Sequence, residues 1–455
     1  MLNTLDEIII VCSRIMWGPH MLLLLIGAGI YLTLRLRGLQ FRRFLHANRY
    51  ILLGVQRKDK SQDKTGDITP LQALMTSLSS AVGNGNIVGV ATAIAVGGPG
   101  AVFWMWICAL VGMATKFSEV VLGVLYRKSN PDGTMMGGPM IYLQQAVRWK
   151  AMGKILAGFS AFAMGMKVLF TTALMQSNSI AFAFETQLKI PTWTTGIILA
   201  VITWLVVIGG IKSIGRFSEI LAPFMSFVYV GAGLVIIAIN WSSLPAMVSM
   251  IISDAFTGTA AAGGFAGSTA MMAIRFGVAR GALSNDAGNG SAAVFNAAAK
   301  TDQPVRQGLI AMMDVFIDTI IICTITASVI LLTGQWLSGS TGAELAVNAF
   351  AKDVPFGGWV VVFSALLFGY SSLISNVYYG EQSLAYLFGF RVKKHFRRAF
   401  CALIICGSVI KVNTVWLMAD FLLGLMVLPN LIGLLAMSGI IAKTTKSYFD
   451  SRIAD

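Results

Sequence analysis

The sequence has 455 residues, of which 56% are hydrophobic and only 12% charged, and its net charge is +14. A soluble domain carries roughly 25% charged residues, so this composition excludes an ordinary soluble protein and indicates one that spans a membrane. The basic residues lie in short connections between apolar stretches, with no long basic arm, which argues against a nucleic-acid partner.

A helix needs about 20 apolar residues to cross the hydrocarbon core of a bilayer. The apolar runs do not alternate with polar residues as membrane strands do. The sequence therefore predicts an all-α integral membrane protein with about eleven transmembrane helices. In chain order they lie near residues 18–36, 71–95, 100–126, 154–184, 193–210, 217–240, 256–279, 307–333, 357–388, 399–416 and 418–442.

Lys and Arg are concentrated in alternate connections between these spans. The richest connection follows the first span, and another dense one, with Arg391, Lys393 and Lys394, joins the ninth and tenth spans. Basic loops stay in the cytoplasm. We therefore expect a multi-pass protein of the cell inner (plasma) membrane, with its N-terminus outside and its C-terminus in the cytoplasm.

The second span contains two glycines and two asparagines at mid-membrane depth, namely Gly83, Asn84, Gly85 and Asn86. Both residue types disfavour a helix interior. A break in a membrane helix survives where its freed backbone groups face a cavity or ligand, since N–H groups suit a carboxylate and carbonyls suit Na⁺. We predict such a break here. The alternative is a close helix crossing through small residues.

The seventh span contains a second run of small residues, with Gly263, Gly264 and Phe265 at its centre. Taken alone, close packing explains this run equally well. Its position five spans after the first run suggests two inverted five-helix repeats. The predicted organisation is an N-terminal helix with its basic connection (1–66), two repeats (67–245 and 246–442) and a cytoplasmic tail (443–455).

Polar residues inside other spans are further candidates. Gln176 lies in span four, Asp318 in span eight, and Ser371, Ser372 and Asn376 in span nine. Serine hydroxyls can supply oxygen ligands to Na⁺, although a membrane serine often bonds back to its own helix. An intramembrane carboxylate such as Asp318 is a functional candidate by default.

Three further features have structural interpretations. Lys116 and Glu119 have the spacing of a helical ion pair, and Lys167 could extend to the membrane interface. The glycine-punctuated segment 280–288 is expected to be a cytoplasmic turn that acts as a hinge or gate contact, or a simple loop cap.

Several motifs follow one another along nearly the whole chain. They include Trp17-Gly18-Pro19, Gly83-x-Gly85-Asn86-Ile87, Gly137-Gly138-Pro139-Met140, Gln176-Ser177-Asn178-Ser179, the Arg280–Gly288 segment and Tyr378-Tyr379-Gly380-Glu381. In these motifs the sequence resembles the alanine/glycine:cation symporter family, the sodium:alanine symporters. The resemblance implies a leucine-transporter-type core of ten helices after one extra helix. It also implies a secondary active transporter that imports a small neutral amino acid with sodium, by alternating access.

The resemblance also assigns site residues. It implies that Gly83, Gly85 and Asn86 belong to a broken helix at the substrate and that Gln176 lines the pocket. The residue patterns described above add Asn84, Gly263, Gly264, Phe265 and Asn376 to the predicted substrate site. The resemblance implies a sodium site formed by the hydroxyls of Ser371 and Ser372 and by backbone carbonyls near Ser79 and Val82.

The chain departs from the family pattern at several positions. Asp286 stands where relatives usually have Glu, Thr172 and Ala173 replace Gly-Asn, and Ser375-Asn376 replaces a frequent Gly-Trp. If Asn376 faces the pocket, the cavity is larger and more polar, and serine or glutamine becomes credible beside alanine and glycine. The alternative is that Asn376 packs against a neighbouring helix through a hydrogen bond.

Two other functions are alternatives to a sodium symporter. Coupling to protons is the nearer alternative, and a channel is less favoured because no filter motif is repeated. No enzyme is expected, because the sequence lacks a phosphate-binding loop, a Gly-x-Ser-x-Gly motif and a zinc-ligand pair. The expected partners are a small amino acid, sodium and the lipid bilayer.

Overall fold

The computed structural model describes residues 16–56, 65–146, 150–257, 270–410 and 413–451. In chain order the helices are α2 (Pro19–Arg35), α3 (Leu39–Arg42), α4 (Phe44–Gln56), α5 (Pro70–Ala81), α6 (Val88–Gly97), α7 (Gly100–Leu125), α8 (Pro139–Ala146), α9 (Lys150–Lys167), α10 (Ala173–Leu188), α11 (Thr192–Val207), α12 (Gly210–Ile239), α13 (Leu244–Thr257), α14 (Ala270–Asn285), α15 (Ser291–Ala297), α16 (Pro304–Val315), α17 (Thr324–Leu332), α18 (Gly342–Asp353), α19 (Gly357–Phe388), α20 (Val392–Val409), α21 (Asn413–Ala436) and α22 (Ser438–Asp450).

Short elements join or interrupt these helices. Single 3₁₀ turns are η1 (Asn84–Asn86), η3 (Trp241–Ser243) and η5 (Gln335–Leu337), and the π-helical segments are η2 (Val168–Thr172) and η4 (Phe316–Cys323). Strands β1 (Lys128–Ser129) and β2 (Met135–Met136) form a small antiparallel hairpin. Both π segments lie inside longer helical runs, where such segments often mark functional positions.

Several helices have the length and composition to cross a membrane. Among the described residues, five runs qualify singly: Gly100–Leu125, Lys150–Glu185, Gly210–Ile239, Pro304–Leu332 and Gly357–Phe388. Two bent pairs, α5 with α6 and the end of α21 with α22, raise the number to seven. The shorter apolar helices α2 and α11 coincide with the first and fifth predicted spans. The seventh predicted span overlaps α13 and α14, and the residues between those two helices lie outside the described part of the chain.

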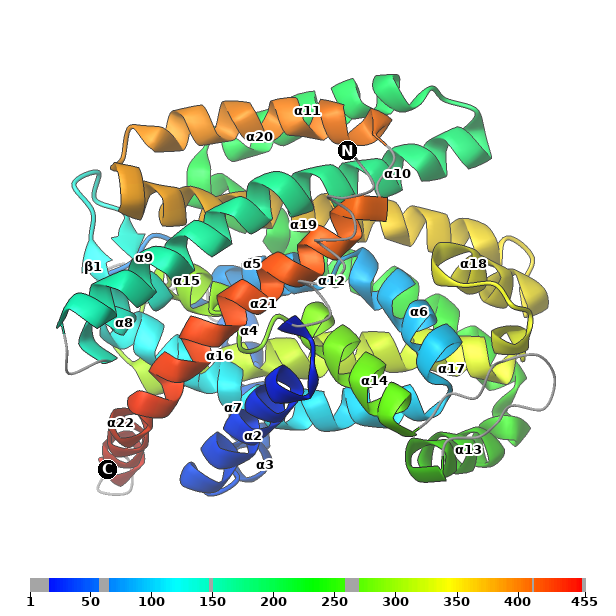
Figure 1. Ribbon diagram of the computed structural model, residues 1–455, viewed down its shortest axis with the longest axis horizontal. Coiled ribbons are helices and arrows are strands. Elements are labelled where there is room, and N and C mark those ends of the chain that lie inside the picture. Colours follow the sequence, from blue (N-terminus) through cyan, green and yellow to red (C-terminus); the bar gives the residue numbers. More distant parts are fainter. Residues whose placement is uncertain (1–15, 57–64, 147–149, 258–269, 411–412, 452–455) are drawn as a thin grey trace.

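Helices that are distant in sequence pack together around a buried centre. Figure 1 shows the long helices running between two opposite ends of the molecule, with α22 and β1 near the left end and α13 and α18 near the right. Helix α7 packs against α14 and α16 and is mostly buried, whereas only 28% of the apolar window of α12 is buried. The exposed apolar side chains on α12, such as Phe224 and Phe227, form a surface suited to lipid.

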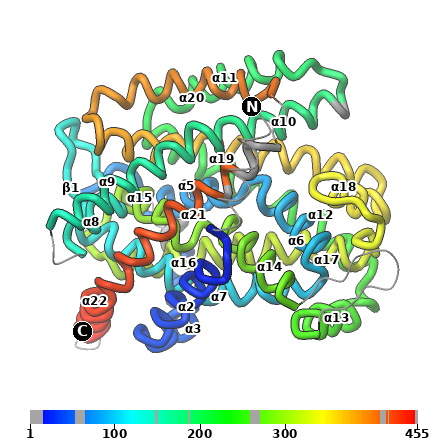
Figure 2. Tube along the Cα trace, viewed as in Figure 1, coloured from blue at the N-terminus to red at the C-terminus, as the bar shows by residue number. Residues whose placement is uncertain are grey.

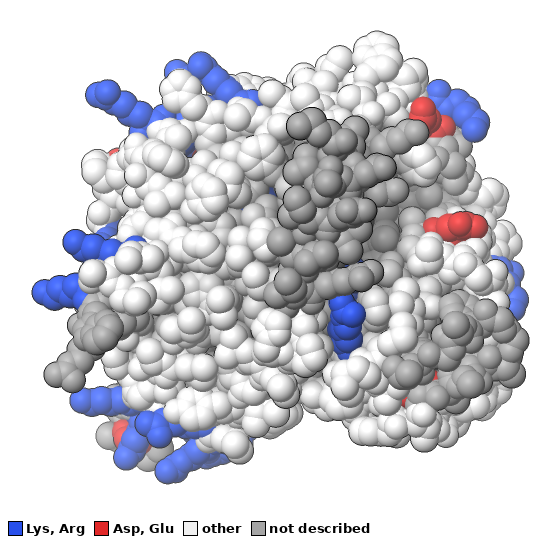
Figure 3. Space-filling view, viewed as in Figure 1, with Lys and Arg blue, Asp and Glu red and all other residues white. Residues whose placement is uncertain are grey.

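The charged side chains are unevenly distributed on the face shown in Figure 3. Lys and Arg gather along the left edge, where α22 and the turn between α19 and α20 lie in Figure 1. The middle of this face carries few charges among the described atoms. An apolar band beside a basic end is the pattern that a protein embedded in a bilayer requires.

Candidate functional site

The chain bends sharply where glycines and asparagines follow one another. Helix α5 begins at Pro70 with Thr69 as its cap, and α6 continues after η1 at an angle of 58°. Val82 and Gly83 are extended, and the N–H of Gly83 donates to Oδ1 of Asn86 at 3.0 Å. Because the Gly83 N–H is used in this way, it does not donate to the carbonyl of Ser79, four residues earlier. The bend therefore leaves carbonyl oxygens free in the interior.

The freed carbonyls face serine hydroxyls from α19. The Oγ of Ser371 lies 3.2 Å from the carbonyl oxygen of Ser79 and 3.3 Å from that of Val82. It also lies 2.9 Å from the carbonyl of Phe368 in its own helix. Three carbonyl oxygens, those of Ser79, Val82 and Phe368, thus surround the Ser371 hydroxyl, and all four residues are buried. The carbonyl and hydroxyl oxygens form a set that suits a hard cation.

Ser372 and Asn376 lie beside this oxygen cluster. Ser372 donates to the carbonyl of Ser80 at 3.1 Å rather than to Ser79 or Val82. Asn376 donates to Oγ of Ser372 at 3.0 Å and accepts from Oγ of Ser80 at 2.6 Å. Asn376 thus bridges α19 and α5, and it is 2% exposed. This is the hydrogen-bonded packing that the sequence offered as the alternative, although the helix it contacts is the one that bears the bend.

Gln176 reaches the bend from α10. Its Oε1 accepts from Nδ2 of Asn84 at 2.8 Å, and both side chains are buried. A methyl group placed on Gly83 would lie 3.2 Å from Nε2 of Gln176 and 3.4 Å from Oγ of Ser372. Side chains from α10 and α19 thus lie close to this backbone, and a larger residue at this position would have to displace them by a few tenths of an ångström. The Oδ1 of Asn84 has no hydrogen-bond partner among the described residues.

A second interruption lies between α14 and α15. Residues 286–290 connect the two helices, and Asp286, Gly288 and Gly290 have positive φ angles of 55°, 96° and 85°. The sequence predicted a cytoplasmic turn over 280–288, but this part of the chain is buried, with Asn285 fully so and Asp286 only 4% exposed. The turn also begins later than expected, at residue 286, because residues 280–285 continue α14. Polarity and glycines in the sequence do not reveal which helices surround a turn.

Helix α7 holds both ends of this interruption with opposite charges. Nζ of Lys116 donates to the carbonyl of Asn285, the last residue of α14, at 2.7 Å. Oε1 of Glu119 accepts from the N–H groups of Gly288 and Gly290, just before α15, at 2.8 and 3.2 Å. A cation at a helix C-terminus and an anion at a helix N-terminus are both favourable. The expected pairing of Lys116 with Glu119 is therefore replaced by contacts to two different helix ends.

Two carboxylates one turn apart connect this region to the first bend. Asp314 forms an ion pair with Lys116 at 2.7 Å and accepts from Oγ of Ser77 in α5 at 2.6 Å. Asp318 accepts from Nδ2 of Asn86 at 2.6 Å and from Oγ of Ser284 at 2.6 Å. The two interruptions in the chain are thus bonded to each other through Asn86, Ser284 and Asp318.

Lys167 does not extend to the membrane interface as expected. It is 8% exposed, its Nζ lies 4.0 Å from Oδ1 of Asp286, and it stands 5.6 Å from the centre of the Tyr379 ring. Asp286 therefore faces a buried cation. The sequence missed this contact because Lys167 is near the middle of a long apolar run.

Other predicted site residues stand apart. Gly85 belongs to η1, but a methyl group placed on it would meet only the backbone of Ser284, at 4.0 Å. Gly263, Gly264 and Phe265 lie outside the described residues. The structure therefore brings together predicted residues from the second, fourth and ninth spans.

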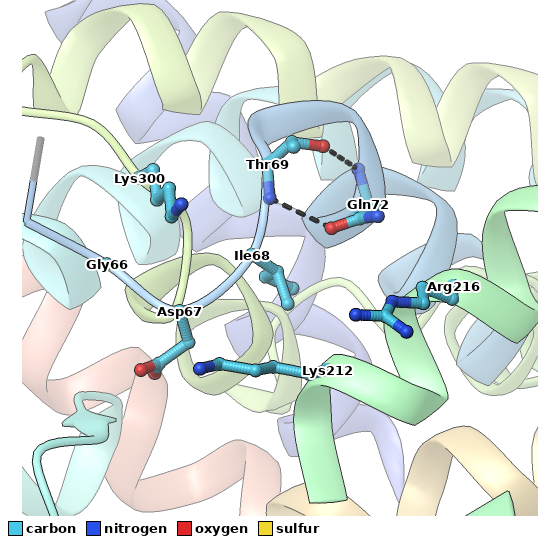
Figure 4. Close-up of a pocket in the computed structure, with 8 residues that line it drawn as sticks. All are labelled: Gly66, Asp67, Ile68, Thr69, Gln72, Lys212, Arg216 and Lys300. Atoms are coloured by element: carbon cyan, nitrogen blue, oxygen red, sulfur yellow. Dashed lines mark hydrogen bonds between the residues drawn. The ribbon is translucent and has the colours of Figure 1, made fainter. Parts of the chain in front are cut away.

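A separate cavity opens at the start of α5. It has a volume of about 520 Å³ and is lined by Gly66, Asp67, Ile68, Thr69, Gln72, Lys212, Arg216 and Lys300. Figure 4 shows Asp67 and Lys212 pointing toward each other, and Thr69 and Gln72 joined by reciprocal hydrogen bonds. Burial raises the pKa of Asp67 above its usual value, while Met135 N–H and Lys212 act against that shift. Seven residues of helix separate Gln72 from Ser79, about 10 Å.

The comparisons with known proteins identify the family. A model of the sodium:alanine symporter family matches residues 2–455. This chain belongs to the sodium:alanine symporter family. It is 42% identical over 444 residues to the sodium/alanine symporter AgcS of Methanococcus maripaludis, covering 97% of this chain and 96% of the relative. It is 36% identical over 455 residues to the probable sodium/glutamine symporter GlnT of Bacillus subtilis, covering 98% and 91%.

The solved structures agree on the fold. MhsT, crystallised with L-phenylalanine, superimposes with a TM-score of 0.58 at 14% identity, over 83% of this chain and 89% of that one. At this identity the likeness shows the fold alone, which is of the leucine-transporter type. The chain is thus a multi-pass membrane transporter and not an enzyme.

Proposed function

We propose that this transporter imports a small neutral amino acid together with sodium, by alternating access. The observation that carries the proposal is the meeting of the Ser79 and Val82 carbonyls at the α5–α6 bend with the Ser371 hydroxyl of α19. Beside it, the Gln176 amide accepts a hydrogen bond from the Asn84 side chain. Membrane helices are interrupted where backbone groups serve a ligand, because hydrocarbon cannot satisfy them.

In this proposal sodium lies among Ser79 O, Val82 O and Ser371 Oγ. The Ser371 hydroxyl would donate its hydrogen bond to the carbonyl of Phe368, which is the nearest one, and would direct a lone pair toward the ion. Ser372 would contribute its second lone pair, since one already accepts from Asn376. Ser371 is therefore the principal hydroxyl ligand and Ser372 the secondary one.

The amino acid would lie on the other side of the bend. Its carboxylate would accept from the N–H groups of Asn84 and Gly85, since those of Gly83 and Asn86 already donate within the bend. The unpartnered Oδ1 of Asn84 would accept from its ammonium group. Gln176 orients Asn84 and completes the polar wall, while Gly263, Gly264 and Phe265 remain proposed substrate residues from the seventh span.

The substrate is proposed to be of the alanine and glycine class, with serine or glutamine as candidates. The names of relatives support this range, since AgcS is a sodium/alanine symporter and GlnT a probable sodium/glutamine symporter. Asn376 acts through its bonds to Ser80 and Ser372. A tryptophan at this position would fill space beside the bend, and asparagine leaves that space to a larger or more polar side chain.

Proton coupling is the second candidate, and Asp318 is the observation that favours it. Its carboxylate is fully buried and accepts from the neutral groups of Asn86, Ser284 and Thr319. Among the described residues no cationic side chain forms an ion pair with it. A buried carboxylate without a counter-ion can be neutralised by a proton or by a metal cation.

The proposed architecture has one N-terminal helix and two inverted five-helix repeats, over 67–245 and 246–442. The interruption between α14 and α15 would be the counterpart of the α5–α6 bend. The basic edge in Figure 3 supports an orientation with the N-terminus outside and the C-terminus in the cytoplasm.

Proteoliposomes test these proposals. Vesicles loaded with unlabelled amino acid should accumulate labelled alanine, glycine, serine or glutamine by counterflow, and a channel should not. Uptake should follow an imposed sodium gradient at equal pH on both sides. Uptake that is driven by a pH gradient and is independent of sodium would show that protons, not sodium, are the coupling ion.

A further inference from the structure

A basic cavity lies at the periphery of the molecule, between the end of α11 and the start of α20. These helices are distant in sequence but lie side by side (Figure 2). The cavity has a volume of about 610 Å³, and Trp204, Ile208 and Phe390 supply its apolar lining. Nη1 of Arg397 donates to the carbonyl of Ile208 at 3.2 Å and so joins the two helix ends.

Five cationic or titratable side chains also line this cavity, and two of them already have acidic partners. Arg397 binds Glu381 through Nε at 2.5 Å and Nη2 at 2.9 Å. Lys393 binds Asp132 at 3.4 Å and stands over the Phe390 ring. The carboxylates of Glu381 and Asp132 are therefore already paired with cations.

The remaining side chains are Arg391, Lys394 and His395, and all three are exposed. Neither Arg391 nor Lys394 forms an ion pair within the described part of the chain. Since the neighbouring carboxylates are neutralised by Lys393 and Arg397, the rim keeps an uncompensated positive charge. Such a rim attracts an anion.

An apolar stripe leads from the cavity along the outside of α11. Ile197, Val201, Leu205 and Ile208 follow one another at helical spacing and are 43%, 55%, 67% and 58% exposed. The stripe extends over 11 residues of rise, about 16 Å. That is about half of the ~30 Å hydrocarbon core, so the stripe has the length of one leaflet.

We propose that this cavity binds the headgroup of an anionic phospholipid, with an acyl chain along the α11 stripe. Arg391 and Lys394 would bind the phosphate and its negative charge, Trp204 would lie at the level of the glycerol, and the stripe would contact the chain. Basic pockets between helices at the membrane surface bind anionic headgroups in this way. A zwitterionic lipid lacks the net charge, and a free phosphate ion lacks the chain.

The test measures lipid binding to the purified full-length protein in detergent. Phosphatidylglycerol, phosphatidylcholine and inorganic phosphate are titrated separately at one ionic strength, and native mass spectrometry counts the bound molecules. The test variant is Arg391→Gln/Lys394→Gln. The matched control is Lys443→Gln/Lys446→Gln, which removes the same charge from exposed positions on α22. Both should elute as wild type in size exclusion, because the changed side chains are exposed.

The expected result is selective binding of phosphatidylglycerol to wild type and control, with about thirtyfold weaker binding to the Arg391/Lys394 variant. Trp204→Ala should also weaken phosphatidylglycerol binding. Equal phosphatidylglycerol binding by all variants would overturn the site. Equal binding of phosphatidylcholine would overturn recognition of charge, and phosphate binding as tight as that of the lipid would replace the lipid by a free anion.

Discussion

The buried ion pair between Lys116 and Asp314 should dominate the stability of the helices around the two interruptions. Both side chains are 0% exposed and their charged atoms are 2.7 Å apart. Each also serves a further group, since Lys116 donates to the Asn285 carbonyl and Asp314 accepts from Ser77. Removal of one partner leaves the other charge buried and unpaired, which costs about 3–5 kcal/mol. Lys116→Met and Asp314→Leu should each lose about that much stability.

The double variant Lys116→Met/Asp314→Leu should lose much less than the sum of the single losses. It leaves neither member of this pair as an unpaired buried charge, and it loses mainly the hydrogen bonds to Asn285 and Ser77, about 1–3 kcal/mol for each group left unsatisfied. Equilibrium unfolding in mixed detergent micelles would give the four corners of the cycle. Single losses below about 1 kcal/mol, or losses that simply add in the double variant, would show that these charges do not depend on each other.

The remaining predictions concern the proposed site. Ser371→Ala should raise the sodium concentration needed for half-maximal uptake by about tenfold, one lost ligand being worth ~1.4 kcal/mol, and Ser372→Ala should raise it less; unchanged sodium dependence in the double variant would exclude both. Gln176→Ala should weaken amino-acid binding about tenfold in a titration while the protein remains folded, because the buried hydrogen bond from the Asn84 side chain is lost. A binding curve identical to that of the wild type would remove Gln176 from the site. Asn376→Trp should shift the substrate ranking toward alanine and glycine, with Asn376→Ala as the control that removes the amide without filling space; an unchanged ranking at normal expression would place specificity elsewhere.

The bend between α5 and α6 was predictable from sequence because its cause is local. Glycine and asparagine lower helix propensity wherever they stand, and four of them within Gly83–Asn86 concentrate the effect at one point. The approach of Ser371 to this bend came from the family resemblance. No local pattern distinguishes a serine that meets a carbonyl in another helix from one that bonds back to its own, and Ser371 has both contacts.

The interruption between α14 and α15 was misplaced because its cause is not local. A segment with Arg280, Asp286 and several glycines indicates a turn, and only the surrounding helices make it buried. Lys116 and Glu119 of α7 bind backbone groups at its two ends, and Lys167 of α9 faces Asp286. Lys116 and Glu119 are three residues apart, so the sequence predicts an ion pair between them. The structure separates them because one meets a helix C-terminus and the other a helix N-terminus.

The run from α16 through η4 places Asp314 and Asp318 one turn apart, and each carboxylate holds a different part of the second span. Asp314 binds Ser77 within α5, whereas Asp318 binds Asn86 beyond the bend. A hinge movement of α5 about the bend must therefore break the contact of Ser77 and can leave that of Asn86 intact. Lys116 reduces the cost of such a movement, because Asp314 keeps its counter-ion when Ser77 departs. Asp318 has no counter-ion among the described side chains and would keep only its bonds to Ser284 and Thr319 without Asn86. We therefore expect its bond to Asn86 to persist when α5 moves.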